Sequence, residues 1–157
     1  MEFRRGNLLE TDINIIAHGC NAQGVMGSGV AKQIRAKWHG AYDTYKIYCD
    51  HFATSSISPR MLGTNVYYTD HVNGKTIVNC ITQEEFGAGI RQVNYAAILQ
   101  CFQRIVGDFK SGRPDKNFKI AIPKIGAGLG GGSWEVIKTL LLDFEALHKV
   151  EFVVYEL

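Results

Sequence analysis

The chain lacks long hydrophobic runs and carries almost no excess charge. Its 157 residues include 17 Lys or Arg and 15 Asp or Glu, so the formal net charge is +2. Nucleic-acid-binding domains usually show a concentrated basic face, so we expect no nucleic-acid partner. No apolar stretch approaches the roughly 20 residues that a membrane span needs, and residues 1–6 lack the apolar core of a signal peptide. We therefore expect a cytoplasmic protein with no membrane partner.

Cysteine is scarce, and the four cysteines, Cys20, Cys49, Cys80 and Cys101, show no C-x-x-C spacing. Metal ligands must converge, and nothing in this spacing pairs the thiols, so we expect no bound metal. Free thiols suit a reducing compartment. Cys80 and Cys101 lie in apolar periodic segments and are predicted to be core residues, and Cys20 is predicted to lie in the core or on a pocket floor.

The common signatures of nucleotide enzymes and serine hydrolases are also absent. The chain contains no G-x-x-x-x-G-K-[ST], which excludes a Walker loop. The glycines of residues 24–29 do not form G-x-G-x-x-G, and no acidic residue about 20 positions further on is placed for a ribose, which argues against a dinucleotide cofactor. G-x-S-x-G is missing as well. We therefore expect no cofactor.

Short β-rich runs alternate with longer helical patterns, which predicts one α/β domain over residues 1–157. The predicted strands are residues 3–5, 13–17, 65–68, 76–81, 119–122 and 152–155, and the predicted helices are residues 30–38, 41–49, 93–109 and 134–147. Several strands are continuous apolar runs, as expected of central strands covered on both faces. Ser133 stands where a helix N-cap belongs. Asn73-Gly74 predicts a type I′ hairpin turn.

Two glycine-rich loops each follow a predicted strand and precede a helix. The first, residues 18–31, begins with His18 and Asn21 and contains Gly27-Ser28-Gly29. The second runs over residues 125–134 and has five glycines in seven residues. Glycine costs backbone entropy, so such a concentration requires either close approach of the backbone to a ligand or a chain of tight turns. Because ligands of open α/β sheets bind at the carboxyl ends of strands, both loops are predicted to face one anion-binding cleft.

His18 and Asn21 are the candidate catalytic residues of the first loop. A lone histidine at a strand end is often a hydrogen-bonded structural residue. Asn21 is compatible with a simple turn residue. Beside the glycines, however, they indicate a site in which an imidazole stands a few residues from a phosphate cradle. The other four histidines fall at helix ends or in loops and are predicted to be surface residues.

Taken together, these residues resemble a macrodomain, the ADP-ribose-binding α/β/α module, over essentially the whole chain. The likeness rests on Gly6-Asn7-Leu8-Leu9, on the H-x-C-N segment from His18 to Asn21, on both glycine loops in this order, and on the closing strand 152–157. It implies a three-layer α/β/α fold with a central mixed sheet of about six strands. The H-x-C-N segment and Thr82-x-x-x-Phe86-Gly87 are most similar to the ADP-ribose-1″-phosphate phosphatase branch.

By this resemblance, the chain removes the terminal phosphate of ADP-ribose-1″-phosphate as a monomer without metal or cofactor. His18 would be the catalytic histidine, as nucleophile or general acid, and Asn21 would hold the distal ribose. The ligand-binding residues implied are those of the first strand end and the two glycine loops: Gly6, Asn7, Leu8, Gly27, Ser28, Gly29, Val30, Gly126, Ala127, Gly128, Leu129 and Gly130.

Departures from related branches leave other functions open. ADP-ribosyl hydrolases that share the first loop place a lysine after the fourth strand, where this chain has Gln83, and the glutamate-directed enzymes have an aspartate where it has Gly130. An ADP-ribosyl hydrolase or O-acetyl-ADP-ribose deacetylase would therefore need a water activated by substrate or by Asn21. A non-catalytic ADP-ribose-binding module is the third alternative, because this fold does not fix function.

Overall fold

The structure is a computed structural model, and it describes residues 1–54, 61–110 and 118–156. Strands and helices alternate along these residues, as the sequence predicts. In chain order, the elements are β1 (Glu2–Arg5), the short 3-10 helix η1 (Leu8–Glu10), β2 (Ile15–Cys20), α1 (Gly29–Lys37), α2 (His39–Thr54), β3 (Asn65–Asp70), β4 (Lys75–Ile81), α3 (Tyr95–Lys110), β5 (Phe118–Ile122), α4 (Trp134–His148) and β6 (Val150–Glu156).

The strands form one six-stranded mixed sheet in the order β1-β6-β5-β2-β4-β3. Only β3 runs antiparallel to its neighbour, β4, and the other paired strands are parallel. The central strands are covered on both faces, which explains their continuous apolar sequences. In β2 and β5, for example, Ile16, Ala17, Ile120 and Ala121 are fully buried.

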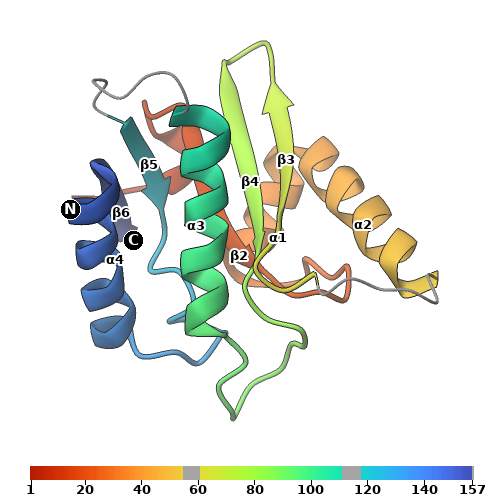
Figure 1. Cartoon of the computed structure of the whole chain (residues 1–157). Helices are drawn as coiled ribbons and strands as arrows, with labels where there is room; N and C mark the ends of the chain where they lie inside the picture. The colour runs from red at the N-terminus through yellow and green to blue at the C-terminus, as the bar shows by residue number, and fades with distance from the viewer. Residues whose placement is uncertain (55–60, 111–117, 157) are drawn as a thin grey trace.

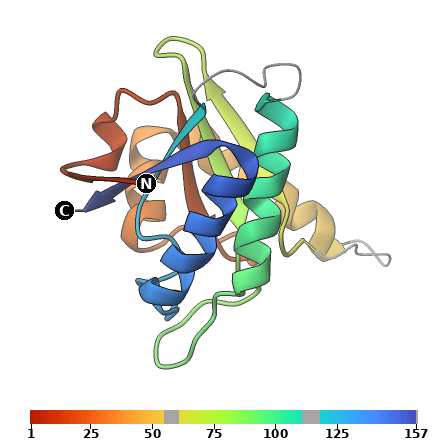
Figure 2. The ribbon, with the colours of Figure 1, turned by 60° about the vertical axis from the view of Figure 1, so that its left-hand side comes forward.

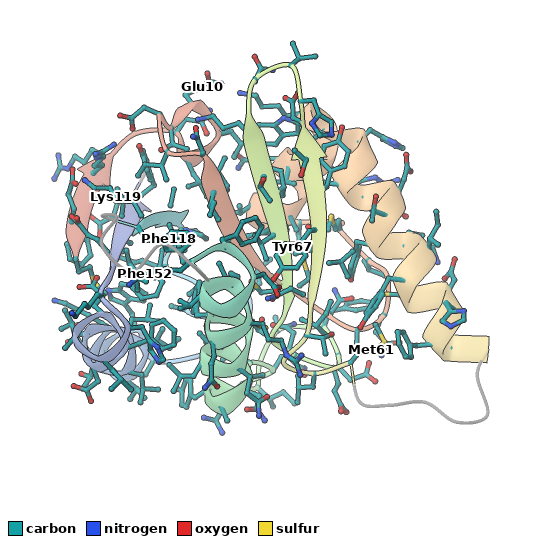
Figure 3. All side chains as sticks on the ribbon, turned by 45° about the horizontal axis from the view of Figure 1, so that its top comes forward. Glu10, Met61, Tyr67, Phe118, Lys119 and Phe152 are labelled. Atoms are coloured by element: carbon teal, nitrogen blue, oxygen red, sulfur yellow. The ribbon has the colours of Figure 1, made fainter. Side chains whose placement is uncertain are left out.

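Helices cover both faces of the sheet, so the domain has three layers (Figure 1). Helices α3 and α4 pack on one face, where the ring of Phe152 meets Phe102 at a centroid distance of 4.7 Å and Phe144 at 6.0 Å. Figure 3 shows Phe152 on this side of the sheet, near α4. On the opposite face, Ile34 and Trp38 pack against β2 and β4. The predicted three-layer fold with about six strands is thereby confirmed.

Side-chain caps determine where α4 and α3 begin. The hydroxyl of Ser133 accepts a hydrogen bond from the backbone N–H of Val136 and caps α4, as expected. Helix α3 begins at Tyr95 rather than at residue 93, because the side chain of Asn94 accepts from the N–H of Ala97 and starts the helix there.

All four cysteines are buried and free. The predictions for Cys80, Cys101 and Cys20 are therefore confirmed.

The prediction of a type I′ turn at Asn73-Gly74 is wrong. Asp70 pairs with Lys75, so the hairpin loop has four residues, and Asn73 does not adopt the positive φ that a type I′ turn requires. A carboxylate oxygen of Asp70 accepts instead from the backbone N–H groups of Val72 and Asn73. This local capping favours a wider loop over the two-residue turn.

The predicted strand 13–17 is shifted along the chain by the same kind of side-chain capping. The backbone N–H of Ile13 bonds the hydroxyl of Thr11 instead of a neighbouring strand, and β2 begins at Ile15. The strand then continues to Cys20, so His18 lies inside it rather than at its end. Because His18 lies within a central strand, it is buried and stands opposite Asn79 of β4.

The carboxyl ends of β2, β4 and β5 lie at one edge of the sheet because the three strands are parallel. The loops that leave these ends, residues 21–28, 82–94 and 123–133, gather at this edge, at the bottom of Figures 1 and 2. None of the helices in the described segments is long and apolar enough to cross a membrane.

Candidate active site

Backbone hydrogen bonds tie the three loops together. The N–H of Ala22 donates to the carbonyl of Glu84 at 3.1 Å, which joins the first loop to the second. The N–H groups of Gln92 and Val93 both donate to the carbonyl of Gly130, at 2.9 and 3.0 Å, which joins the second loop to the third. The three loops at this edge of the sheet are therefore held together as one structural unit.

The loops enclose a cleft of about 490 Å³. It lies between the first turn of α1 and the glycine-rich loop of residues 125–134, with the end of β2 beneath. Its lining residues are His18, Gly19, Cys20, Asn21, Val25, Gly27, Ser28, Gly29, Val30, Ala31, Thr82, Gln83, Phe86, Gly87, Ala88, Pro123, Lys124, Ile125, Gly126, Gly128, Leu129 and Gly130.

A second hollow of about 440 Å³ adjoins the cleft and is built from both ends of the chain. It is lined by Gly6, Asn7, Leu8, Leu9, Val30, Gln33, Pro123, Lys124, Ala127, Gly128, Tyr155 and Glu156. Four of these residues, Val30, Pro123, Lys124 and Gly128, also line the cleft. The two depressions therefore form one elongated site.

Every site residue predicted from the sequence lines one of the two depressions, and their roles there stay predictions. The structure adds residues that sequence reasoning left out of the site: Thr82, Gln83, Phe86 and Lys124 in the cleft, and Gln33, Tyr155 and Glu156 in the second hollow. The motif from Thr82 to Gly87 was a usable signal for the first three. Lys124 and Glu156 carry no local pattern and become visible only when the chain is folded.

The glycines of the loops divide into two kinds. Gly126 has φ of +76°, and a Cβ there would lie 2.9 Å from Val93, so the fold itself requires a glycine. Gly27 and Gly128 have no positive φ, and a Cβ would meet nothing closer than 3.7 Å at Gly27 and nothing within 4 Å at Gly128. Packing does not explain these two glycines, and both line the cleft. We therefore predict that a ligand closely approaches the backbone at these two positions.

The amino end of α1 supplies hydrogen-bond donors to the cleft. The first N–H groups of a helix have no acceptor within the helix. At α4 the Ser133 hydroxyl caps one of them, but the corresponding residue of α1, Ser28, makes no side-chain cap. Gly29, Val30 and Ala31 of this first turn all line the cleft. Such uncapped N–H groups, with the helix dipole behind them, form an anion-binding site.

His18 is held on the cleft floor by a single strong hydrogen bond. Its ring is 1% exposed, and Nε2 lies 2.7 Å from Oδ1 of Asn79, the residue opposite it in β4. The Asn79 amide nitrogen donates to the carbonyl of Ala41, so its oxygen faces the ring and must accept. Nε2 therefore carries the proton, and Nδ1 carries the lone pair, which faces only the weak thiol donor of Cys20 at 3.8 Å.

Burial lowers the pKa of His18 from 6.5 to about 4, because a charged imidazole loses its hydration there, and the hydrogen bond to Asn79 offsets only part of this. The imidazole is neutral at pH 7. Burial likewise raises the pKa of the neighbouring Cys20 thiol, whose Sγ lies 3.7–3.8 Å from the two ring nitrogens. The floor of the cleft is thus uncharged, and Nδ1 is its basic atom.

The side chain of Asn21 is engaged in shaping the first loop. Its Oδ1 accepts from the N–H of Gln23 at 2.9 Å and from the hydroxyl of Tyr45 at 2.8 Å, and its Nδ2 donates to the carbonyl of Val25 at 2.9 Å. Its other Nδ2 hydrogen bonds no atom of the described residues. Asn21 therefore orders the loop that leads to Gly27, and its contact with a ribose stays a prediction.

We expect Asn79→Asp to raise the pKa of His18 by about 1 to 3 units, because a carboxylate beside Nε2 favours the charged imidazolium. The measurement is an NMR titration of the His18 ring. Asn65→Asp is the matched control, since Asn65 lies on β3 and bonds the carbonyl of Cys101 instead of a histidine. An unchanged His18 titration in Asn79→Asp would contradict the assigned pairing.

Within residues 1–54, 61–110 and 118–156, no group of three or more His, Cys, Asp or Glu side chains is arranged to hold a metal ion. The lining of the cleft combines backbone amides, a neutral imidazole, small and apolar side chains and one lysine, Lys124. Such a lining is suited to a phosphorylated ligand held by oriented N–H groups.

Comparison with known proteins identifies the family to which the chain belongs. The Macro domain family model matches residues 17–141, and the chain belongs to this family. Among curated proteins, it is 25% identical to a protein of Candida glabrata named ADP-ribose 1″-phosphate phosphatase, over 100% of this chain and 98% of the relative. It is 29% identical to a Candida albicans protein of the same name, over 85% of this chain and 83% of the relative.

A solved structure supports the same assignment. The macrodomain of Thermus aquaticus DarG superimposes with a TM-score of 0.76 and is 28% identical, covering 99% of this chain and 97% of that one. The macrodomain resemblance drawn from the sequence is thereby confirmed.

Proposed function

We propose that this macrodomain is an ADP-ribose-1″-phosphate phosphatase that releases phosphate and leaves ADP-ribose. The observation that carries the proposal is the uncapped amino end of α1, which opens on a cleft floored by a neutral histidine. The names of the two Candida relatives support the same reaction. We further propose that the protein acts as a monomer in the cytoplasm, without nucleic acid.

The two adjoining depressions suit a ligand that has two halves joined by a diphosphate. The adenosine half would occupy the second hollow, where Asn7 Oδ1 accepts from the N–H of Leu9 and retains a lone pair for the adenine amine. The diphosphate would cross the shared region at Gly128. The distal ribose and its phosphate would lie in the cleft, at the first turn of α1.

The neutral state of His18 favours roles in which it accepts a proton or attacks phosphorus. In the reaction, a nucleophile forms a bond to phosphorus and the bond from phosphorus to the 1″ oxygen breaks. Nδ1, which carries the lone pair, would take the proton of an attacking water and pass it to the 1″ oxygen as the bond to phosphorus breaks. If Nδ1 instead attacked directly, the 1″ oxygen would leave with a proton from water, and a second water would cleave the phosphohistidine to release phosphate. Backbone N–H groups would stabilise the charge that spreads over the phosphoryl oxygens, without a metal ion.

The direct test is phosphate release from ADP-ribose-1″-phosphate in the presence and absence of EDTA. We expect release that EDTA does not abolish. If the protein binds ADP-ribose by calorimetry but releases no phosphate, the phosphatase assignment is wrong and the site is that of an ADP-ribose-binding module or of a hydrolase acting on linked ADP-ribose. Loss of release with EDTA would contradict the metal-free mechanism.

The loop of residues 82–94 gives no support to the alternative of a lysine-dependent hydrolase. Gln83 stands where that lysine would be, and its Nε2 donates to the backbone carbonyl of Glu85 at 2.7 Å. An amide is not nucleophilic. Gln83 therefore contributes to the shape of the loop and offers no replacement for the missing amine.

The two kinds of glycine give a paired prediction. We expect Gly128→Ala to fold with unchanged stability and to bind ADP-ribose about tenfold more weakly or worse, a loss of roughly 1.4 kcal/mol, because the new methyl group enters the space of the ligand. Calorimetry measures the affinity and urea unfolding the stability.

Gly126→Ala is the matched control and has the opposite signature. Its positive φ costs a non-glycine residue about 1–2 kcal/mol, and the methyl group would also press on Val93, so the free energy of unfolding should fall. Wild-type affinity in Gly128→Ala would show that the ligand does not approach this backbone.

A further inference from the structure

Lys124 occupies the junction of the elongated site. It is one of the four residues that line both the cleft and the second hollow. Of the described residues that line either depression, it is the only Lys or Arg. The backbone amides of the glycine loops carry partial charges alone, so Lys124 is the one full positive charge that the described lining offers to an anion.

Lys124 is paired with a carboxylate of the same site. Its Nζ lies 2.6 Å from Oε1 of Glu156, and the two side chains are 45% and 36% exposed. The hydrogen bond from Lys124 lowers the pKa of the Glu156 carboxyl, so Glu156 is charged at neutral pH. Glu156 itself lines the second hollow. An ion pair this exposed contributes little to stability, so the fold does not depend on it.

We infer that Lys124 exchanges Glu156 for a phosphate of the bound ligand. This inference rests on the proposed function, which places the diphosphate where the two depressions join. A lysine ammonium on a flexible stem can turn from one oxygen to another without moving the backbone. Two phosphate groups offer more negative charge than one carboxylate, so the exchange favours the ligand-bound pairing.

The exchange makes Glu156 a competitor of the ligand. In the free protein, Glu156 holds the ammonium that a phosphate requires, and its own charge repels a phosphate. Lys124 therefore confers selectivity for phosphorylated nucleotides over uncharged nucleosides, and Glu156 sets how tightly they bind. Backbone amides at Gly128 and α1 then position the phosphates.

The first test compares ADP-ribose with adenosine. We expect Lys124→Gln to weaken ADP-ribose binding about tenfold by calorimetry at low salt, and to leave adenosine binding, followed by NMR shifts, unchanged. The loss should shrink at high salt because screening removes the contribution of an exposed charge. Lys124→Arg, which keeps the charge, should retain most of the affinity.

Lys46→Gln is the matched control. Lys46 forms an ion pair of the same 2.6 Å length with Asp50 and is 41% exposed, but it lines neither depression. It should bind ADP-ribose as the wild type does. Equal affinities in Lys124→Gln and Lys46→Gln would overturn the inference. Failure of the wild type itself to bind ADP-ribose would instead reject the proposed function, and the inference with it.

A double-mutant cycle separates exchange from simple repulsion. Glu156→Gln alone should tighten ADP-ribose binding about threefold, since it frees Lys124. In the Lys124→Gln background, the same change should give a clearly smaller gain, because no ammonium remains to be freed. An undiminished gain in that background would show that Glu156 acts by repulsion alone and would overturn the exchange.

Discussion

His18→Ala is expected to lower phosphate release from ADP-ribose-1″-phosphate by about 10² to 10⁴-fold, the range over which a positioned acid or base usually contributes. Affinity for ADP-ribose should stay close to that of the wild type, because the proposed phosphate contacts come from backbone amides and Lys124 rather than from the imidazole. A turnover assay and calorimetry on the same preparation measure the two quantities.

The variant needs two controls, because His18 is buried. Alanine leaves Oδ1 of Asn79 without its donor, so circular dichroism must first show that the variant is folded. His71→Ala removes an exposed histidine from the distant β3–β4 hairpin and should keep wild-type turnover. Wild-type turnover in folded His18→Ala would remove the histidine from the mechanism and leave the amides and Lys124 as the catalytic groups.

The second large effect is acid destabilisation. The pKa of His18 is about 4 in the folded protein and 6.5 in an unfolded chain, so the unfolded state binds the proton more tightly. Between these values, stability is lost as the pH falls, and at pH 6.5 and above the contribution of the neutral ring is fully present. A difference of about 2.5 units, at 1.36 kcal/mol each, corresponds to about 3 kcal/mol lost by pH 4.

Urea unfolding of the wild type and of His18→Asn from pH 7 to pH 4 measures this contribution. Asparagine retains an N–H donor for Asn79 but does not titrate. Protonation of carboxylates whose pKa values are lowered, such as Asp12 and Asp70, also lowers stability in acid, but equally in both proteins. Parallel curves for the two proteins would show that His18 is protonated as easily in the fold as in water.

Local sequence signals were sufficient for the layers of the fold and for most of the site. Each glycine loop lies between a strand pattern and a helix pattern, and parallel strands bring such loops to one edge by topology alone. That is why Gly27 and Gly128, about 100 positions apart, line one cleft. Ser133 capped its helix as predicted, because capping depends on residues within one turn.

Side-chain contacts between neighbouring strands could not be predicted from the sequence. The role of Asn79 depends on the register of β2 and β4, which places it opposite His18, and no local pattern encodes that register. The pairing of Lys124 with Glu156 depends on β6 lying beside β5. The prediction of a two-residue turn at Asn73-Gly74 failed for a related reason. The side chain of Asp70, which lies outside that dipeptide, determines the conformation of the loop.

The order of the sheet places the beginning and the end of the described chain side by side. β1 pairs with β6, and the N–H of Gly6 bonds the carbonyl of Glu156, so the second hollow combines residues from both ends. Contacts so distant in sequence close a long loop, whose entropic cost grows slowly with loop length. During synthesis on the ribosome, the glycine loops emerge well before β6. A nucleotide that spans both depressions would therefore bind fully only when β6 has docked beside β1.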